Sequence, residues 1–468
     1  MNRVARARTS PVRDLVFIAF LGALFGFGLR RPFLFVLAYV YIDIVSPQRL
    51  TYLLLNSVPI SMIAVVLAVA GWLLFDDKRD VRLAPRQGLL LLLLVYCWIT
   101  TKSADFPIDA EGKWEWVWKA LAFAIFLPLT LRTKLRIEAL LLFMILSAGS
   151  IVIVGGIKTL ASGGGGYGEL NLMVSNNSGL YEGSIISTVA ICIIPLILWF
   201  ARHGTIFKPD WKVKIFCYAL VFACLLIPVG TSARTGLLCI ALMALLMLRD
   251  AKKRLMYLAL MVAVPVLAFP FLPQSFLARM DTIRTYKGDA SASTRVAVWQ
   301  WTIDYAREHP FGGGFEAYRG NHVRYDRIVV EGERNNQVVK RELEVDKARA
   351  YHSSYFEMLG EQGYPGLALW LLISLIGVVR MEMLRWRYLR GPEETLWAGQ
   401  LASGLQMAHL TYLLGGAFVG IAFQPFIYML IGAQIGLDTY LARKRQEAAW
   451  QPLRRRKRQT PAEAALTV

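Results

Sequence analysis

The residues best suited to group-transfer chemistry surround His352, in "YHSSYFEMLGEQG", where a polar stretch meets an apolar run. A histidine changes charge near neutral pH and can act as a base, although near a span it more often only completes a hydrogen-bond network. Tyr351 and Ser353 are polar neighbours that could support it. Glu357 and Glu361 could orient the imidazole, or could reach out to water from the edge of the membrane.

Two arginines have side chains suited to the same group-transfer chemistry. Arg234, in "GTSARTGLL", is placed at the outer end of an apolar helix, where an arginine either serves function or extends its head group to water. Arg295 begins an amphipathic segment four residues before Trp299, and its alternative is a solvated surface arginine. A guanidinium group offers a planar fork of donors that suits phosphate oxygens.

The composition predicts a membrane protein that crosses the bilayer many times. Of its 468 residues 56% are hydrophobic and 18% are charged, and the apolar residues occur in blocks. The net charge of +19 lies mostly in short links between these blocks, which is the positive-inside pattern. Because this pattern explains the basic residues as anchors of the membrane topology, we expect no nucleic-acid partner. The five cysteines lie in apolar runs and indicate no disulfide framework.

Eleven segments are long and apolar enough to be predicted as membrane helices, and none alternates with a period of two as a barrel strand would. They are residues 58–75, 87–102, 116–131, 137–157, 183–201, 213–229, 235–249, 254–272, 364–380, 396–418 and 423–441. Two shorter stretches, 14–29 and 33–46, are counted as one broken or re-entrant crossing, because two crossings would place the basic N-terminus outside. The fold predicted is therefore an all-α polytopic membrane protein with about twelve transmembrane helices and a cytoplasmic C-terminus.

This reading divides the chain into four parts. They are an N-terminal transmembrane bundle (1–272), a large outer loop (273–350), the C-terminal transmembrane helices (351–441) and a basic cytoplasmic tail (442–468). The outer loop is expected to be a small, partly helical cap, because loops of this length usually have a function.

Within the outer loop, "STRVAVWQWTIDYAREH" predicts an amphipathic helix. Its spacing places Val296, Trp299 and Ile303 on one face. The following "HPFGGG" predicts a helix end and a turn.

No metal site is predicted. Outside the large loop, the carboxylates considered as ligands are Asp105, Asp109 and Glu111, which show no pairing typical of a divalent cation. The "GGGG" run at 163–166 lacks the lysine and hydroxyl residue of a phosphate-binding loop.

These motifs resemble those of a known family. "HSSYFEMLGEQG" is similar to the histidine motif of the bacterial O-antigen ligases, which is His, then Asn, Ser or Gln, nine residues and Gly; here these are His352, Ser353 and Gly363. "RTGLL" matches the arginine motif of that family as Arg234 and Leu238.

The resemblance extends over nearly the whole chain. The segment around Arg295 resembles the start of the large periplasmic loop of these ligases. The opening "RDLVFIAFLGALFGFGLRRPFLFVLAYVYIDIVSPQRLTY" is similar to the variant of these ligases found with exosortase systems.

The resemblance implies a GT-C-like glycosyltransferase of the bacterial inner membrane with its active site facing the periplasm. Its donor would be a glycan on undecaprenyl diphosphate, its acceptor a sugar hydroxyl of the lipid A core, and its product lipopolysaccharide. It would need no cofactor, metal or nucleotide sugar. In this scheme His352 is the general base, and Arg234 and Arg295 bind the diphosphate.

Other functions remain open from the sequence. O-antigen polymerases and protein O-oligosaccharyltransferases share much of this layout. A transporter of lipid-linked glycan is the alternative of another class, although no internal repeat is evident and the polar candidates collect at one surface. Transport would leave the glycan inside the cell when the gene is lost, whereas a ligase would leave it outside and unattached.

Overall fold

The structure of the chain is a computed structural model. It describes residues 11–51, 55, 58–79, 81, 83–162, 179–250, 254–271, 277, 290–331 and 338–449. The glycine run 163–166 and most of the predicted tail lie outside the described residues.

Helices make up most of the described chain. They are α1 (Pro11–Gly28), α2 (Phe33–Val45), α3 (Pro47–Leu50), α4 (Ile60–Phe75), α5 (Pro85–Lys102), α6 (Pro107–Thr130), α7 (Lys134–Ser162), α8 (Gly183–His203), α9 (Trp211–Gly230), α10 (Arg234–Leu248), α11 (Arg254–Ala268), α13 (Ala290–Glu308), α14 (Ser354–Leu389), α15 (Leu396–Gly416) and α16 (Pro425–Ala449), with short 3-10 turns η1 (Gly179–Tyr181), η2 (Phe269–Phe271), η4 (Ala317–Gly320) and η5 (Glu393–Thr395).

The helical, membrane-protein character of the chain is confirmed. Within the described residues, four helices are long and apolar enough to cross a bilayer, namely Lys134–Ala161, Gly183–His203, Trp211–Gly230 and Ser354–Leu389. Four shorter helices, starting at Asp14, Phe33, Ile60 and Arg234, are also apolar. The predicted total of twelve crossings stays a prediction.

Some predicted spans are less apolar than these four helices, because they contain polar residues. On α15, Gln406 and His409 are buried inside the bundle, and on α16 Gln434 is fully buried. The Gln434 side-chain amide lies 3.1 Å from His409 Nδ1, and Gln406 Nε2 donates to the carbonyl of Val378 at 3.1 Å. Polar residues that face a helix bundle rather than lipid are tolerated when they find such partners.

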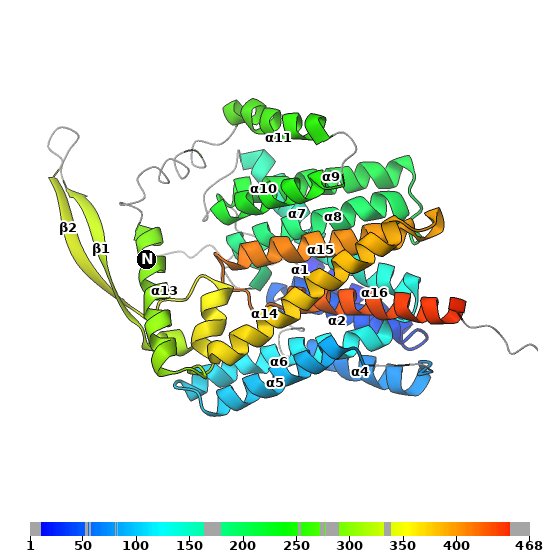
Figure 1. Cartoon of the computed structure of the whole chain (residues 1–468), viewed down its shortest axis with the longest axis horizontal. Coiled ribbons are helices and arrows are strands. Elements are labelled where there is room, and N and C mark those ends of the chain that lie inside the picture. Colours follow the sequence, from blue (N-terminus) through cyan, green and yellow to red (C-terminus); the bar gives the residue numbers. More distant parts are fainter. Residues whose placement is uncertain are drawn as a thin grey trace, which may run out of the picture.

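Helix α8 lies at the centre of the bundle. Sixteen of its 21 residues are buried, which is typical of a helix that is apolar on all sides. It packs against α15, α9, α10 and α7. Figure 1 shows most helices running roughly along one direction.

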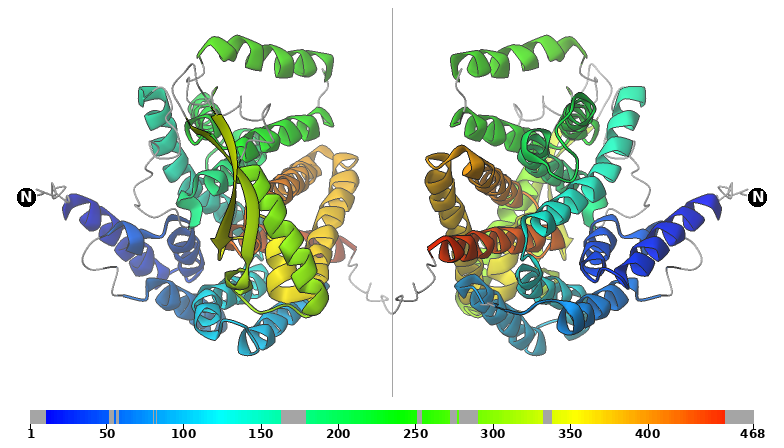
Figure 2. Two further views of the ribbon diagram at one scale, coloured as in Figure 1. Left: turned by 90° about the vertical axis from the view of Figure 1, so that its left-hand side faces the viewer. Right: turned by 90° about the vertical axis from the view of Figure 1, so that its right-hand side faces the viewer.

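A cap covers one end of the bundle, which we term the cap end. It contains α13, η4 and a hairpin of β1 (His322–Glu331) and β2 (Val338–Lys347), paired antiparallel from His322↔Lys347 to Glu331↔Val338. Helix α13 and the hairpin project there, across the direction of the bundle (Figures 1 and 2).

The cap differs from the sequence prediction in two respects. The hairpin was not predicted, since the strands carry charged residues at positions of both faces. Helix α13 was predicted, and it ends at Glu308 as "HPFGGG" indicates. The predicted apolar face of α13 is wrong at Val296, which is 57% exposed, while Val298 and Thr302 are buried.

Helix α14 is two helices joined by a kink. Gly363 has φ 63° and ψ −168°, so the 36-residue element divides into a short helix, 354–362, and a long one from residue 364, where the predicted span begins. Pro365 follows and cannot donate to the carbonyl of Glu361. We call residues 354–362 the short helix.

Candidate functional site

His352 lies at the cap end, between β2 and the start of the short helix. Its side chain is exposed, and its φ of 48° is in the left-handed region. Histidine enters this region more readily than most residues, but the conformation still costs about 1 kcal/mol or more. The surrounding structure therefore has to impose it.

The first turn of the short helix fixes the backbone next to His352. Ser353 is the N-cap, and its carbonyl accepts a hydrogen bond from the backbone N–H of Glu357 at 2.8 Å. The Ser353 side chain is buried and makes no capping bond. Ser354 Oγ donates to the carbonyl of Val419 and accepts from the N–H of Ile421, both at 2.9 Å.

Helix α13 holds the other side of His352. Trp299 Nε1 donates to the carbonyl of Tyr351 at 2.9 Å, and the Trp299 ring stacks on Phe356 with centroids 4.9 Å apart. The Tyr351 ring is buried and packs edge-on against Tyr318. Since Trp299 binds the residue just before His352, the helical turn preceding Trp299 comes close to the imidazole.

Arg295 occupies that preceding turn, and the charges around His352 reflect this. The pKa of His352 is lowered from 6.5, first by burial and then by the positive charges of Arg295 and Arg349, while Glu182 opposes the shift. The imidazole is open to solvent, yet enough protein surrounds it to weaken its hydration. Burial and nearby cations both favour the neutral ring, which is the form that accepts a proton.

Arg349 reaches this site through a bond network that the sequence analysis missed. Asn321 is fully buried; its Oδ1 accepts from the N–H of Arg349 at 2.9 Å and its Nδ2 donates to the Arg349 carbonyl at 2.7 Å. This clamp closes the base of the hairpin, because Asn321 directly precedes His322 and Arg349 lies two residues after its partner Lys347. Neither residue belongs to a motif, so only the fold reveals them.

Arg234 is the first residue of α10 and lies at the same end of the bundle. Gly236 packs closely against the side chains of Pro228 and Ser187. The Ser187 hydroxyl bonds that of Thr231 at 2.9 Å. Ser187 is in the first turns of α8, just beyond its N-cap, Glu182.

The structure thus brings Arg295 beside His352 and places Arg234 on a neighbouring helix end. Glu182, whose negative charge acts on His352, is the N-cap of α8. Ser187 of the same helix packs against Gly236, two residues after Arg234. Helix N-termini such as that of α10 also favour anions.

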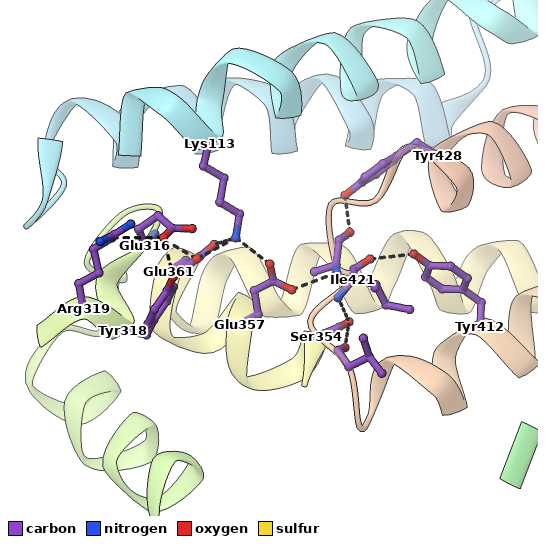
Figure 3. Close-up of polar contacts among 12 residues, drawn as sticks. Lys113, Glu316, Tyr318, Arg319, Ser354, Glu357, Glu361, Tyr412, Ile421 and Tyr428 are labelled. Carbon is purple, nitrogen blue, oxygen red and sulfur yellow. Dashed lines mark hydrogen bonds and ion pairs between the residues drawn. The ribbon is translucent and has the colours of Figure 1, made fainter. Parts of the chain in front are cut away.

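Glu357, the third predicted supporting residue, directs its carboxylate to partners other than the imidazole. Its Oε1 accepts a hydrogen bond from Lys113 Nζ at 2.7 Å, and its Oε2 accepts the N–H of Ala422 at 3.1 Å (Figure 3). Glu361 accepts from the same ammonium group at 2.8 Å with both carboxylate oxygens.

Lys113 was also missed by the sequence analysis, although it carried a signal. It is a basic residue in an acidic outer link, close to the start of a predicted span, where a charged residue usually has a partner. We term Lys113, Glu357 and Glu361 the Lys113 cluster.

The glycine that ends the histidine motif has a structural explanation. The segment after α13 crosses the end of the short helix, where Gly313 N–H donates to the Gly360 carbonyl at 3.1 Å and Gly314 N–H donates to that of Glu361 at 3.0 Å. The kink at Gly363 frees these carbonyls, and a Cβ at 363 would collide with the backbone of Pro310. The crossing joins the helix that carries Arg295 to the helix that follows His352.

Within the part of the chain that the structure describes, no group of three or more histidine, cysteine, aspartate or glutamate side chains is arranged to hold a metal ion. At the Lys113 cluster, an ammonium group lies between the carboxylates.

Comparison with known proteins agrees with the placement of the motifs. Residues 12–205 match a family of unknown function, and residues 218–371 match the family described as O-antigen ligase. No curated protein sequence matches the chain. The O-antigen ligase match contains Arg234, Arg295, His352 and Gly363. The chain therefore carries an O-antigen ligase domain at residues 218–371.

Proposed function

We propose that the protein is an O-antigen ligase, a metal-independent inverting glycosyltransferase that moves a glycan from undecaprenyl diphosphate to a sugar hydroxyl of the lipid A core. The observation that carries this proposal is the pairing of His352 with Arg295 through the Trp299–Tyr351 hydrogen bond. A base and a cation are thereby held together at one end of a membrane bundle.

The reaction divides between these groups. The acceptor hydroxyl attacks the anomeric carbon from the face opposite the diphosphate, and the bond from that carbon to the diphosphate oxygen breaks with its electron pair leaving on oxygen. His352 accepts the hydroxyl proton, which supports a rate gain of about 10²–10⁴-fold. Arg295 and Arg234 stabilise the departing diphosphate by charge-assisted hydrogen bonds.

The lowered pKa of His352 suits this role. A base has to be unprotonated before the acceptor arrives, and burial with two nearby arginines favours that state. Because the imidazole is exposed, an acceptor can reach it from the cap end.

The proposal places the protein in the bacterial inner membrane with His352 on the periplasmic side and the C-terminus in the cytoplasm. The apolar helices and the O-antigen ligase domain support the membrane location. The basic links support the orientation.

The test is reconstitution of the purified protein in vesicles with undecaprenyl-diphosphate glycan and, separately, lipid A core, an unglycosylated protein and a second lipid-linked glycan. Transfer to lipid A core supports a ligase. Transfer only to the protein would indicate an oligosaccharyltransferase, and transfer only to the second glycan would indicate a polymerase. Movement of the donor across the vesicle membrane without transfer would indicate a transporter. The assay contains EDTA, and activity that requires added magnesium would contradict the role given to the arginines.

A further inference from the structure

We propose that the Lys113 cluster is a positioning device for transfer: Lys113 holds the short helix in the one place where His352 faces the reacting atoms beside Arg295. This inference deepens the proposed function and rests on it. The cluster would act through His352 and would not touch either substrate.

The contacts of Lys113 are short and shielded from water. Its ammonium group binds Glu357 at 2.7 Å and Glu361 at 2.8 Å, and the side chains of the three residues are 10%, 9% and 0% exposed. The two acids are four residues apart, so they lie on one face of the short helix, toward α6 (Figure 3).

The same carboxylates bind the two loops that enclose the site. Glu357 Oε2 accepts the N–H of Ala422, in the loop between α15 and α16. Glu361 Oε1 accepts the N–H of Glu316, in the segment that connects α13 to the hairpin. One ammonium group therefore ties α6, the short helix, the α15–α16 loop and the cap together.

His352 depends on this arrangement because it directly precedes the N-cap of the short helix. Since the backbone of His352 is held in the left-handed region, the position of the first helical turn determines the direction in which the imidazole points. Glu357 lies in that turn, and its own N–H bonds the Ser353 carbonyl. A shift of about 1 Å in a reacting group can cost about 100-fold in rate.

Stability alone gives no reason for a buried ion cluster here. Apolar residues of the same volume often stabilise a fold equally well, because removing charges from water is costly. Directional bonds from one ammonium to two carboxylates specify one geometry, whereas apolar packing allows several. Transfer needs His352 in one defined position, and directional bonds of this kind define one position.

The decisive variant is Glu357→Gln, measured in the reconstituted transfer assay. Lys113 and Glu361 still balance each other's charge, so the protein is expected to fold. Lys113 and Ala422 bond different oxygens of Glu357, and glutamine replaces one of these oxygens by an NH₂ group, so one of the two bonds is lost in this geometry. We expect the single-turnover rate to fall about tenfold to 100-fold, with donor affinity unchanged.

Two further readouts separate positioning from folding. The pH at which the rate is half-maximal should rise toward 6.5 as His352 moves relative to Arg295, Arg349 and Glu182, the charged groups that act on it. In a double variant with His352→Gln, the Glu357→Gln change should cost little more, because its effect passes through the same residue.

The triple variant Lys113→Met, Glu357→Gln and Glu361→Gln removes the whole cluster, and Lys102→Met is the control. Lys102 forms an exposed pair with Glu111 at 3.4 Å near the same end, so its loss should change nothing. A Glu357→Gln protein with the wild-type rate and pH midpoint would overturn the inference. A loss of rate that only matches the loss of folded protein would also overturn it. If the wild-type protein itself transfers to no acceptor, the proposed function has failed, and the inference with it.

Discussion

Helix α14 is anchored by charges at both ends, and the two anchors differ in burial. At the cap end, Lys113 holds two carboxylates that are almost completely shielded from solvent. At the opposite end, Arg385 pairs with Glu382 at 2.8 Å and with Asp250, but these two acids are 31% and 35% exposed.

The difference in burial predicts a difference in consequence. Removing one partner of a buried ion pair costs about 3–5 kcal/mol, because the charge left behind lacks both water and partner. Pairs open to solvent contribute about 0–1 kcal/mol, and the acids at the opposite end are partly open, although Arg385 itself is only 11% exposed. Changes at the cap end should therefore alter transfer strongly, whereas changes at the opposite end should alter little.

The largest effect is expected at His352. Replacement by glutamine keeps a hydrogen-bonding group but removes the base, so the single-turnover rate should fall about 10²–10⁴-fold. Donor affinity should stay near the wild-type value, since the proposed mechanism assigns the diphosphate to the arginines. A glutamine variant with the wild-type rate would show that His352 only positions the acceptor.

The arginines come next. Arg295→Ala should lower the single-turnover rate about 10²–10³-fold, the range seen when one group that stabilises developing charge is lost. Arg295→Lys and Arg234→Lys should recover little, because a point charge does not reproduce the planar fork. Membrane abundance of each variant is the control. Full activity of Arg234→Ala would remove that residue from the site.

A third change breaks the crossing that joins the two parts of the cap end. Gly363→Ala introduces a side chain at φ 63° and a collision with Pro310, which should cost about 1–3 kcal/mol of stability and lower transfer. Gly88→Ala on α5 is the matched control, because a Cβ there meets no atom within 4 Å. Equal melting temperatures for the two variants would contradict the role given to the kink.

These residues also show what the sequence could and could not predict. Apolar blocks located most of the helices, because burial in lipid requires long apolar runs. The motifs selected Arg234, Arg295 and His352, since each combines a reactive type with a predicted outer helix boundary. The start of the long helix of α14 was also predicted, near Gly363.

The rest depends on contacts between distant segments. Lys113 binds residues more than two hundred positions away, and Asn321 clamps a hairpin whose strands have no clean alternation. Glu357 was predicted to support His352, but the partner it has is Lys113. Pairing across such distances leaves no local pattern in a single sequence.

A smaller effect is expected in the pH dependence of transfer. Because the pKa of His352 is lowered, its imidazole stays neutral at pH values somewhat below 6.5. The rate should therefore rise with pH through a midpoint below 6.5. Arg295→Met removes a positive charge and should move the midpoint up, and Glu182→Gln removes a negative charge and should move it down. Residual activity is measured from pH 4.5 to 8. Shifts in the opposite directions would show that another group titrates.

The smallest effect is expected at the end of α14 opposite the cap. After Arg385→Met, Glu382 keeps Arg249 at 3.0 Å and Asp250 keeps the Ser403 hydroxyl at 2.9 Å, so neither acid is left without a partner. The loss of stability should be about 1 kcal/mol or less, and the single-turnover rate and its pH midpoint should equal those of the wild type. Thermal unfolding in detergent and the transfer assay measure the two quantities on one preparation. A rate as low as that of Glu357→Gln would show that both anchors of α14 position His352, and burial would then not be what separates them.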